Sequence, residues 1–295
     1  MTTPTPSHSH PHPHPRRWAL PALTAWTLAA AALLAGCAGL EVQQRKWIFM
    51  PSQALPRSEG QTAGMDDVWI EHESRESGTR VKLHALWMAA DGADAPVLLY
   101  LHGARRNVAS SAFRIRQMQQ LGFNVLAVDY RGFGRSSDEL PSEAIVYEDA
   151  RAAWAWLARE HPNRARFIFG HSLGGAIAVQ LATEVSDAKG LIVEGTFTSI
   201  PDVFQSMKWG WLPITPLITQ RFDSVGKVER VRMPMLVVHG SHDALVLPEL
   251  GRALYERAPA PKRFVLVEGG THYNTNGVGQ KLYREALRDL FGLGA

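Results

Sequence analysis

Two kinds of segment alternate along the chain from about residue 68 onward. Short, largely apolar runs are typical of strands that are buried on both faces of a parallel sheet. They predict strands at Val97–Leu101, Asn124–Val128, Phe167–Phe169, Leu191–Val193, Met235–Val238 and Phe264–Val267. The stretches between them carry apolar residues at helical spacing. Those stretches predict helices at Ser110–Leu121, Glu143–Arg159 and Ala176–Glu184.

This alternation predicts an α/β fold with a doubly wound, mainly parallel sheet. Ahead of the series, β-rich pieces at Val68–Ile70 and Val81–Trp87 flank a polar turn with Gly78, which indicates a hairpin. Ligands of such sheets bind beyond the carboxyl ends of the strands, so we expect the chemistry there.

The amino-terminal residues have a different composition. Arg16 and Arg17 precede an apolar run, Trp18–Leu34, that ends in Leu34-Ala35-Gly36-Cys37. A basic segment followed by an apolar one is the pattern of an export signal. The ending resembles the lipobox of bacterial lipoproteins, in which the cysteine is acylated and becomes the first residue of the mature protein. Cys37 is the only cysteine in the chain.

Alternatives to this leader stay open. One is a signal anchor with an incidental cysteine, and another is twin-arginine export, from whose pattern Pro15 and Ala19 depart. The Pro-His alternation of residues 8–14 is interpreted as a discarded polar leader rather than a metal site. Because Ala38 and not Asp follows the cysteine, enterobacterial-type sorting predicts the periplasmic face of the outer membrane.

The predicted organisation is therefore a signal peptide at 1–36, a mature arm at 37–64 and one α/β domain at 65–295. The arm carries an apolar patch, Trp47–Met50, that either covers the domain or lies near the membrane. Lys and Arg number 31 against 28 Asp and Glu, and two of the arginines lie in the leader. The mature chain is then nearly neutral, which gives no argument for nucleic-acid binding. With one cysteine, no intrachain disulfide is possible.

The candidate chemistry centres on Gly170-His171-Ser172-Leu173-Gly174. An apolar strand ends in Gly-x-Ser-x-Gly and a helix follows at once, which is the context of a nucleophile elbow. Any Cβ at Gly170 or Gly174 would collide with such a turn. The pentapeptide alone is a modest signal, so the remaining strand ends must supply an acid, a base and an oxyanion hole.

The strand ends do carry such groups. In chain order these motifs are His102-Gly103-Ala104, Asp129-Tyr130-Arg131-Gly132-Phe133-Gly134, Ser172, Glu194-Gly195, His239-Gly240-Ser241-His242-Asp243 and Gly270-Thr271-His272. Serine, then acid, then histidine is the order of an α/β-hydrolase. From about Val68 to Phe291 the chain resembles that superfamily. It is most similar to the small-lid branch that includes eukaryotic membrane-associated hydrolases and protein depalmitoylases. Relatives there often carry Asn where this chain has Ala104.

The roles follow from position. We predict Ser172 as nucleophile, His272 as base and Asp243 as the acid that orients it, with Glu194 as the alternative acid. The backbone N–H groups of Leu173 and Ala104 are the predicted oxyanion hole. Arg105 and Arg106 are either solvated or attract an acidic substrate. No metal or organic cofactor is implied.

Between residues 196 and 231 the chain leaves its strand–helix rhythm. This segment is apolar, rich in proline and placed where a short helical lid would lie. Its apolar content suits acyl or aromatic groups, and Phe197, Trp209 and Trp211 are the predicted substrate contacts. The alternative is two short helices packed in the core.

The resulting hypothesis is a lipid-anchored serine hydrolase that cleaves carboxylic esters or thioesters through an acyl-enzyme. The alternatives are a peptidase of the serine-aminopeptidase type and a catalytically silent envelope lipoprotein on the same fold. A haloalkane dehalogenase is disfavoured because Ser172 stands where that chemistry requires a carboxylate. The expected partners are an acyl substrate and a membrane, with no nucleic acid and no protein partner predicted.

Overall fold

A computed structural model describes residues 36, 38–53, 59–92 and 94–294 of the chain. It divides into two compact units, Met1–Gln43 and Gln44–Ala295. Residues 38–49 are helical, so this helix crosses the boundary between them. The predicted leader run Trp18–Leu34 and Cys37 lie outside the described residues. Among the residues that are described, no helix is both long and apolar enough to cross a membrane.

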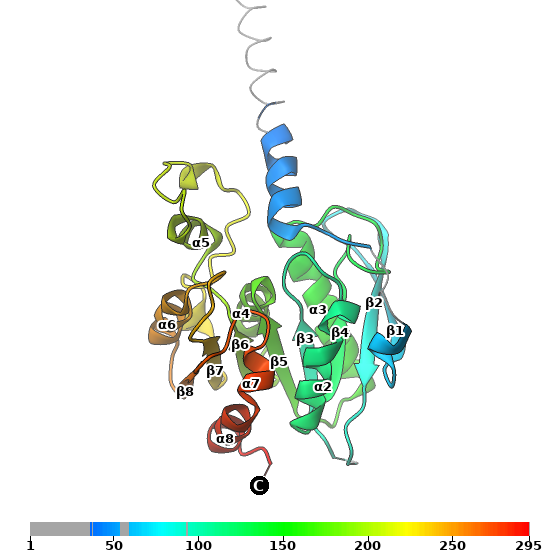
Figure 1. Ribbon diagram of the computed structural model, residues 1–295. Coiled ribbons are helices and arrows are strands. Elements are labelled where there is room, and N and C mark those ends of the chain that lie inside the picture. Colours follow the sequence, from blue (N-terminus) through cyan, green and yellow to red (C-terminus); the bar gives the residue numbers. More distant parts are fainter. Residues whose placement is uncertain (1–35, 37, 54–58, 93, 295) are drawn as a thin grey trace, which may run out of the picture. The chain divides into compact units, whose positions relative to one another are not determined.

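The second unit is built on one eight-stranded sheet (Figure 1) with the order β1-β2-β4-β3-β5-β6-β7-β8. The strands are β1 (Asp66–Glu73), β2 (Arg80–Met88), β3 (Val97–Leu101), β4 (Asn124–Val128), β5 (Arg166–His171), β6 (Ala188–Glu194), β7 (Met235–Gly240) and β8 (Lys262–Val267). Strands β1 and β2 form an antiparallel hairpin, and β2 joins β4 antiparallel. All other pairings are parallel. The predicted mainly parallel α/β sheet is thus confirmed.

The helices are α2 (Ala112–Gln120), α3 (Glu143–Glu160), α4 (Leu173–Glu184), α5 (Ile200–Ser206), α6 (Pro248–Arg257), α7 (Thr275–Val278) and α8 (Gln280–Phe291). The predicted helix at Ser110–Leu121 is shorter, because its first turn is a separate 3-10 turn, Val108–Ser111. Asn107 caps this turn by accepting a hydrogen bond from the Ser110 N–H.

Two hydrophobic cores lie on opposite faces of the sheet. Along β3, Val97, Leu99 and Leu101 join the core that contains α3 and α4, whereas Leu98 and Tyr100 join the core that contains α2 and α8. This alternation explains the continuous apolar run, since every side chain of the strand is buried. Because β3 to β8 are parallel to one another, their carboxyl ends lie at one edge of the sheet, between the two helical layers.

The segment predicted as a lid contains one short helix. Helix α5 is followed by successive turns, including the 3-10 turns Thr215–Leu217 and Val228–Arg230. Ser199 caps α5 by accepting a hydrogen bond from the Asp202 N–H. Pro213 and Pro216 cannot donate a backbone hydrogen bond, which accounts for turns in place of the second short helix of the alternative interpretation.

Candidate active site

The turn from β5 into α4 has the geometry of a nucleophile elbow. Ser172 has φ 56° and ψ −122°, a conformation that residues with a side chain rarely adopt. A Cβ on Gly170 would lie 2.2 Å from the carbonyl oxygen of Gly174. One on Gly174 would lie 2.1 Å from the carbonyl oxygen of Leu101. Both glycines are therefore required by contacts between backbone segments.

Neighbouring backbone and side chains support the strained serine. The Ser172 N–H donates to the Glu194 carbonyl at 2.9 Å, and the Gly175 N–H donates to the Ser172 carbonyl at 2.9 Å. The Thr196 hydroxyl also donates to the Ser172 carbonyl at 2.9 Å. These three bonds offset the unfavourable dihedral angles at Ser172, whose side chain is partly exposed.

His272 and Asp243 meet at this elbow. Nδ1 of His272 lies 2.8 Å from Oδ2 of Asp243, and both residues are buried. Gly195, the residue after Glu194, lies against this pair. A Cβ on Gly195 would be 3.4 Å from His272 Nδ1 and 3.4 Å from Asp243 Oδ2. In the described part of the chain the Ser172 hydroxyl makes no hydrogen bond of its own. The hydrogen bond between a nucleophile and its base is often long in a free enzyme and shortens once substrate binds.

Asp243 is held as an ionised acceptor. Its Oδ1 accepts hydrogen bonds from the N–H groups of Leu245 and Val246 at 3.0 and 2.9 Å. Burial alone would raise the pKa of Asp243, but hydrogen bonds from His239 and His272 hold that pKa well below its ordinary value. A carboxylate in this state fixes the imidazole tautomer with Nδ1 protonated and leaves Nε2 to accept a proton.

Glu194, the alternative acid, has other partners. It is 1% exposed and accepts hydrogen bonds from Arg114 Nε at 2.9 Å and the Tyr283 hydroxyl at 2.5 Å. Arg114 also donates to the carbonyl oxygens of His272 and Tyr273 at 2.9 and 3.0 Å. Glu194 therefore holds the loop of His272 through Arg114 and does not orient its ring.

His171 supports the same loop. Its Nε2–H donates to the His272 carbonyl at 3.0 Å, and the two rings lie 4.8 Å apart. Burial, with Arg114 and His272 nearby, holds the pKa of His171 well below its ordinary value, so this ring is neutral. Neither Arg114 nor His171 was predicted to act here. Arg114 lies in a helix with no motif, so no local pattern identifies it.

The predicted oxyanion donors lie on either side of the elbow. Leu173 is the first residue of α4, where an N–H has no acceptor within the helix. The loop after β3 passes close by, since a Cβ on Gly103 would lie 3.0 Å from the Ser172 Cβ. In the described part of the chain the Ala104 N–H makes no hydrogen bond, which leaves it available to a substrate oxygen.

The loop that carries Ala104 is tied down from behind. Arg105 adopts φ 81°, and its N–H donates to the Phe49 carbonyl at 2.8 Å. Asp129 accepts a hydrogen bond from the Val108 N–H at 2.8 Å. Asp129 thus braces this loop. The side chains of Arg105 and Arg106 are exposed.

The predicted substrate contacts are spread apart. Phe197 is buried in the core close after Gly195, at 3% exposure. Trp209 and Trp211, in contrast, are 58% and 74% exposed. Of the three, only Phe197 directly follows a residue that contacts the elbow, since the Thr196 hydroxyl donates to the Ser172 carbonyl.

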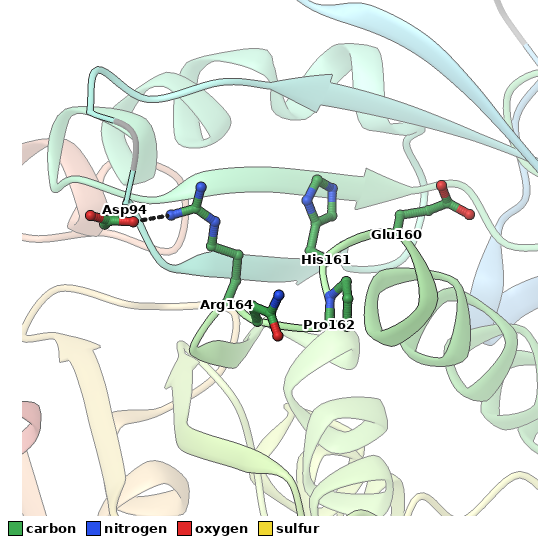
Figure 2. A pocket seen from close by; sticks show the side chains of 6 residues that line it. Asp94, Glu160, His161, Pro162 and Arg164 are labelled. Carbon is green, nitrogen blue, oxygen red and sulfur yellow. Dashed lines mark hydrogen bonds and ion pairs between the residues drawn. The ribbon is translucent and has the colours of Figure 1, made fainter.

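Two other places that resemble sites have simpler explanations. The pocket in Figure 2, lined by Glu160, His161 and Arg164 among others, lies before the amino end of β5 and contains no predicted site residue. His72, Glu148 and Asp149 are close enough together to suggest a metal. Arg131 donates to both of those carboxylates, at 2.6 and 2.8 Å, and supplies the positive charge there.

Comparison with known proteins places the chain in a family. Residues 93–225 match the family model described as serine aminopeptidase, S33. The chain is 32% identical to the uncharacterised protein Rv2307c of Mycobacterium tuberculosis, over 83% of this chain and 86% of that protein. It is 29% identical to the lysophosphatidylserine lipase ABHD12 of Danio rerio, over 60% of this chain and 54% of that one.

The fold has close solved counterparts as well. The esterase Pf2001 of Pyrococcus furiosus superposes with a TM-score of 0.66 and 20% identity, over 82% of this chain and 98% of that one. At this identity the likeness concerns the fold, which agrees with the sheet order and the elbow described above. The chain therefore belongs to the α/β-hydrolase superfamily and is an enzyme of the hydrolase type.

Proposed function

We propose that this hydrolase cleaves carboxylic esters or thioesters through an acyl-enzyme on Ser172. The observation that carries the proposal is the 2.8 Å contact between His272 Nδ1 and Asp243 Oδ2 beside the strained elbow serine. A hydroxyl is a weak nucleophile and needs such an oriented base. The relative ABHD12, named a lysophosphatidylserine lipase, supports an ester of a lipid kind.

In the proposed reaction the Ser172 oxygen attacks the acyl carbon as its proton passes to His272 Nε2. The N–H groups of Leu173 and Ala104 bind the oxyanion that forms. His272 then returns the proton to the departing alcohol or thiol, which leaves Ser172 acylated. Water, deprotonated by His272, attacks the acyl-enzyme and releases the acid, and the hydroxyl of Ser172 regains its proton.

A fluorophosphonate probe tests this assignment. We expect it to label the purified protein at Ser172, and we expect Ser172→Ala to lose both labelling and nearly all turnover, by ~10⁶-fold in related triads. Ser110→Ala, which changes a hydroxyl in the 3-10 turn before α2, is the matched control and keeps both. Activity retained in Ser172→Ala would refute the nucleophile.

A peptidase is the second candidate, because the matching family model is described as a serine aminopeptidase. The same elbow and histidine would serve amide cleavage, with an amine as the leaving group. A panel of p-nitrophenyl esters, acyl thioesters and aminoacyl p-nitroanilides separates the two. Faster turnover of the anilides than of the esters would favour the peptidase.

We also propose that a lipid on Cys37 anchors the enzyme to the bacterial envelope, at the periplasmic face of the outer membrane. The support is the sequence Leu34-Ala35-Gly36-Cys37 after a basic and apolar leader. Metabolic labelling with a clickable fatty acid should mark the wild-type protein and not Cys37→Ser. Label that persists in Cys37→Ser would overturn the anchor, and fractionation of inner and outer membranes tests the location.

A further inference from the structure

The compact unit that begins at Gln44 has a concentration of exposed apolar side chains on two segments. These are residues 44–53, at the end of the amino-terminal helix, and residues 205–221, which extend from α5 (Figure 1). We call their exposed members the apolar face: Trp47, Met50, Met207, Trp209, Trp211 and Leu217, which are 46–74% exposed. Tryptophan is normally buried to a large extent, so three exposed ones on two short segments call for an explanation.

The two segments are joined by direct hydrogen bonds. Gln44 Nε2 donates to the Leu217 carbonyl at 2.8 Å, and the Thr219 N–H donates to Gln44 Oε1 at 2.9 Å. Gln44 is itself buried. Trp47 lies one helical turn after Gln44, on the same side of the helix. Trp47 and Leu217 therefore flank this junction and belong to one continuous surface.

The exposed side chains are held in place by ordered backbone. Successive turns close the second segment, with the N–H groups of Gly210, Leu212 and Leu217 each donating to the carbonyl three residues earlier. A Cβ on Gly210 would lie 2.0 Å from the Gln205 carbonyl oxygen, so glycine is needed for this close packing. The first segment is fixed by Phe49, which is fully buried against Phe222.

The charges on these segments have one sign. Residues 44–53 and 205–221 contain Arg45, Lys46, Lys208 and Arg221 and no Asp or Glu. Exposed tryptophan with lysine and without acidic residues is the composition of protein surfaces that lie at a membrane interface. Basic residues near an anionic leaflet each contribute attraction that falls off within a Debye length.

The chain connects this face to the proposed membrane anchor. Six residues lie between Cys37 and Gln44, and the seven steps from one to the other span at most ~25 Å when fully extended. A tether of this length keeps Gln44, and with it the apolar face, close to the bilayer that holds the anchor. Tethering raises the effective concentration of the second contact, so even a weak surface would stay bound.

From these observations we propose that the apolar face is a membrane-docking surface, and that its occupant is a bilayer containing anionic phospholipid. Trp47 and Leu217 insert at the headgroup level while Lys46 and Lys208 contact phosphates. The inference uses the proposed anchor only to place a bilayer nearby, and it is independent of Ser172 and its chemistry. Docking would also bring the segment after α5 to the place from which a lipid-like substrate arrives.

The test uses the full-length chain with Cys37→Ser, so that an introduced cysteine is the only one, and with the apolar leader Trp18–Leu34 retained as the tether to the vesicle in place of the lipid. A polarity-sensitive dye is attached in three separate variants: Trp47→Cys and Leu217→Cys on the apolar face, and Leu266→Cys on β8 as the control. Leu266 is 41% exposed, so the control dye is also at a partly exposed apolar position. Each protein is reconstituted into phosphatidylcholine vesicles, with or without phosphatidylglycerol, that contain a doxyl-labelled lipid as quencher.

We expect quenching at positions 47 and 217 to exceed that at 266 by several-fold when phosphatidylglycerol is present. Lys46→Glu with Lys208→Glu should reduce it several-fold, as should high salt. Equal quenching at all three positions would overturn the proposal and leave a protein as the partner of this face. Quenching that is unchanged by charge reversal and by lipid composition would overturn the preference of the apolar face for anionic phospholipid. If a dye at 217 prevents cooperative thermal unfolding, Met50→Cys replaces it.

Discussion

At the residue scale, two buried carboxylates near His272 differ in what they bind. Asp243 accepts from His272 and His239, and its pKa stays below the ordinary value because of those hydrogen bonds, although burial opposes this. Glu194 accepts from Arg114 and Tyr283. One carboxylate therefore faces the imidazole, while the other neutralises a buried guanidinium. Substitutions that keep the shape and remove the charge should separate these functions.

We predict that Asp243→Asn lowers kcat by ~10⁴-fold, because the imidazole loses the partner that sets its tautomer. Glu194→Gln should instead destabilise the fold by ~3 kcal/mol, because Arg114 is left buried and uncompensated. Hydrolysis of a p-nitrophenyl ester and thermal unfolding measure the two effects. If Glu194→Gln lost turnover while it unfolded like wild type, the acid would have to be reassigned.

At the element scale, the junction of β5 and α4 depends on backbone contacts that leave no room for a methyl group. The Gly170 Cα position faces Gly174, and Gly174 faces the end of β3, so strand, helix and neighbouring strand meet there. The elbow is consequently a property of three elements together. The pentapeptide fits it because glycine stands at both of the crowded positions.

Gly170→Ala tests this packing. The added Cβ would lie 2.2 Å from a carbonyl oxygen that belongs to the main chain, so the helix must shift. We expect a loss of ~3 kcal/mol in the free energy of unfolding and a larger proportional loss of kcat. Gly60→Ala is the matched control, since a Cβ there meets nothing within 4 Å. Chemical denaturation of both variants provides the comparison, and equal stability would contradict the crowding.

At the scale of the whole molecule, His84 links the hairpin to the loops around the site. Its Nε2 lies 2.8 Å from Asp67 Oδ1, and its Nδ1 lies 3.5 Å from Oδ2 of Asp129, which braces the loop of Ala104. Burial lowers the pKa of His84, but hydrogen bonds to Asp129 and Asp67 outweigh it and the pKa is raised. The protonated ring therefore stabilises the native state.

The sign of the pH dependence follows from that shift. A group whose pKa is higher in the folded state contributes its full stability below its unfolded pKa, about 6.5 for histidine, and loses it as pH rises through the folded value. We predict that His84→Gln destabilises the protein by ~2 kcal/mol at pH 6 and by clearly less at pH 8. His242→Gln removes an exposed imidazole and is the control. Urea unfolding across this pH range measures both, and a difference that grew with pH would contradict the argument.

What the sequence determined by itself is local in origin. Apolar runs such as Val97–Leu101 predicted strands because a continuous apolar run is by itself the pattern of a strand buried on both faces. The elbow and the loops of Asp243 and His272 were likewise predicted from glycine patterns beside strand ends. The α/β-hydrolase fold and the hydrolase class that those motifs predicted are confirmed.

The tertiary structure alone decided which distant groups meet. Arg114 reaches Glu194 and the carbonyl of His272, which are 80 and 158 residues away, and no spacing along the chain encodes such a contact. The structure likewise shows that Gln44 joins the amino-terminal helix to Leu217 and that Trp211 is exposed. Composition indicates only that a segment is apolar. Whether its side chains face the core or the solvent depends on the packing of all the other elements, which is settled only when the chain has folded.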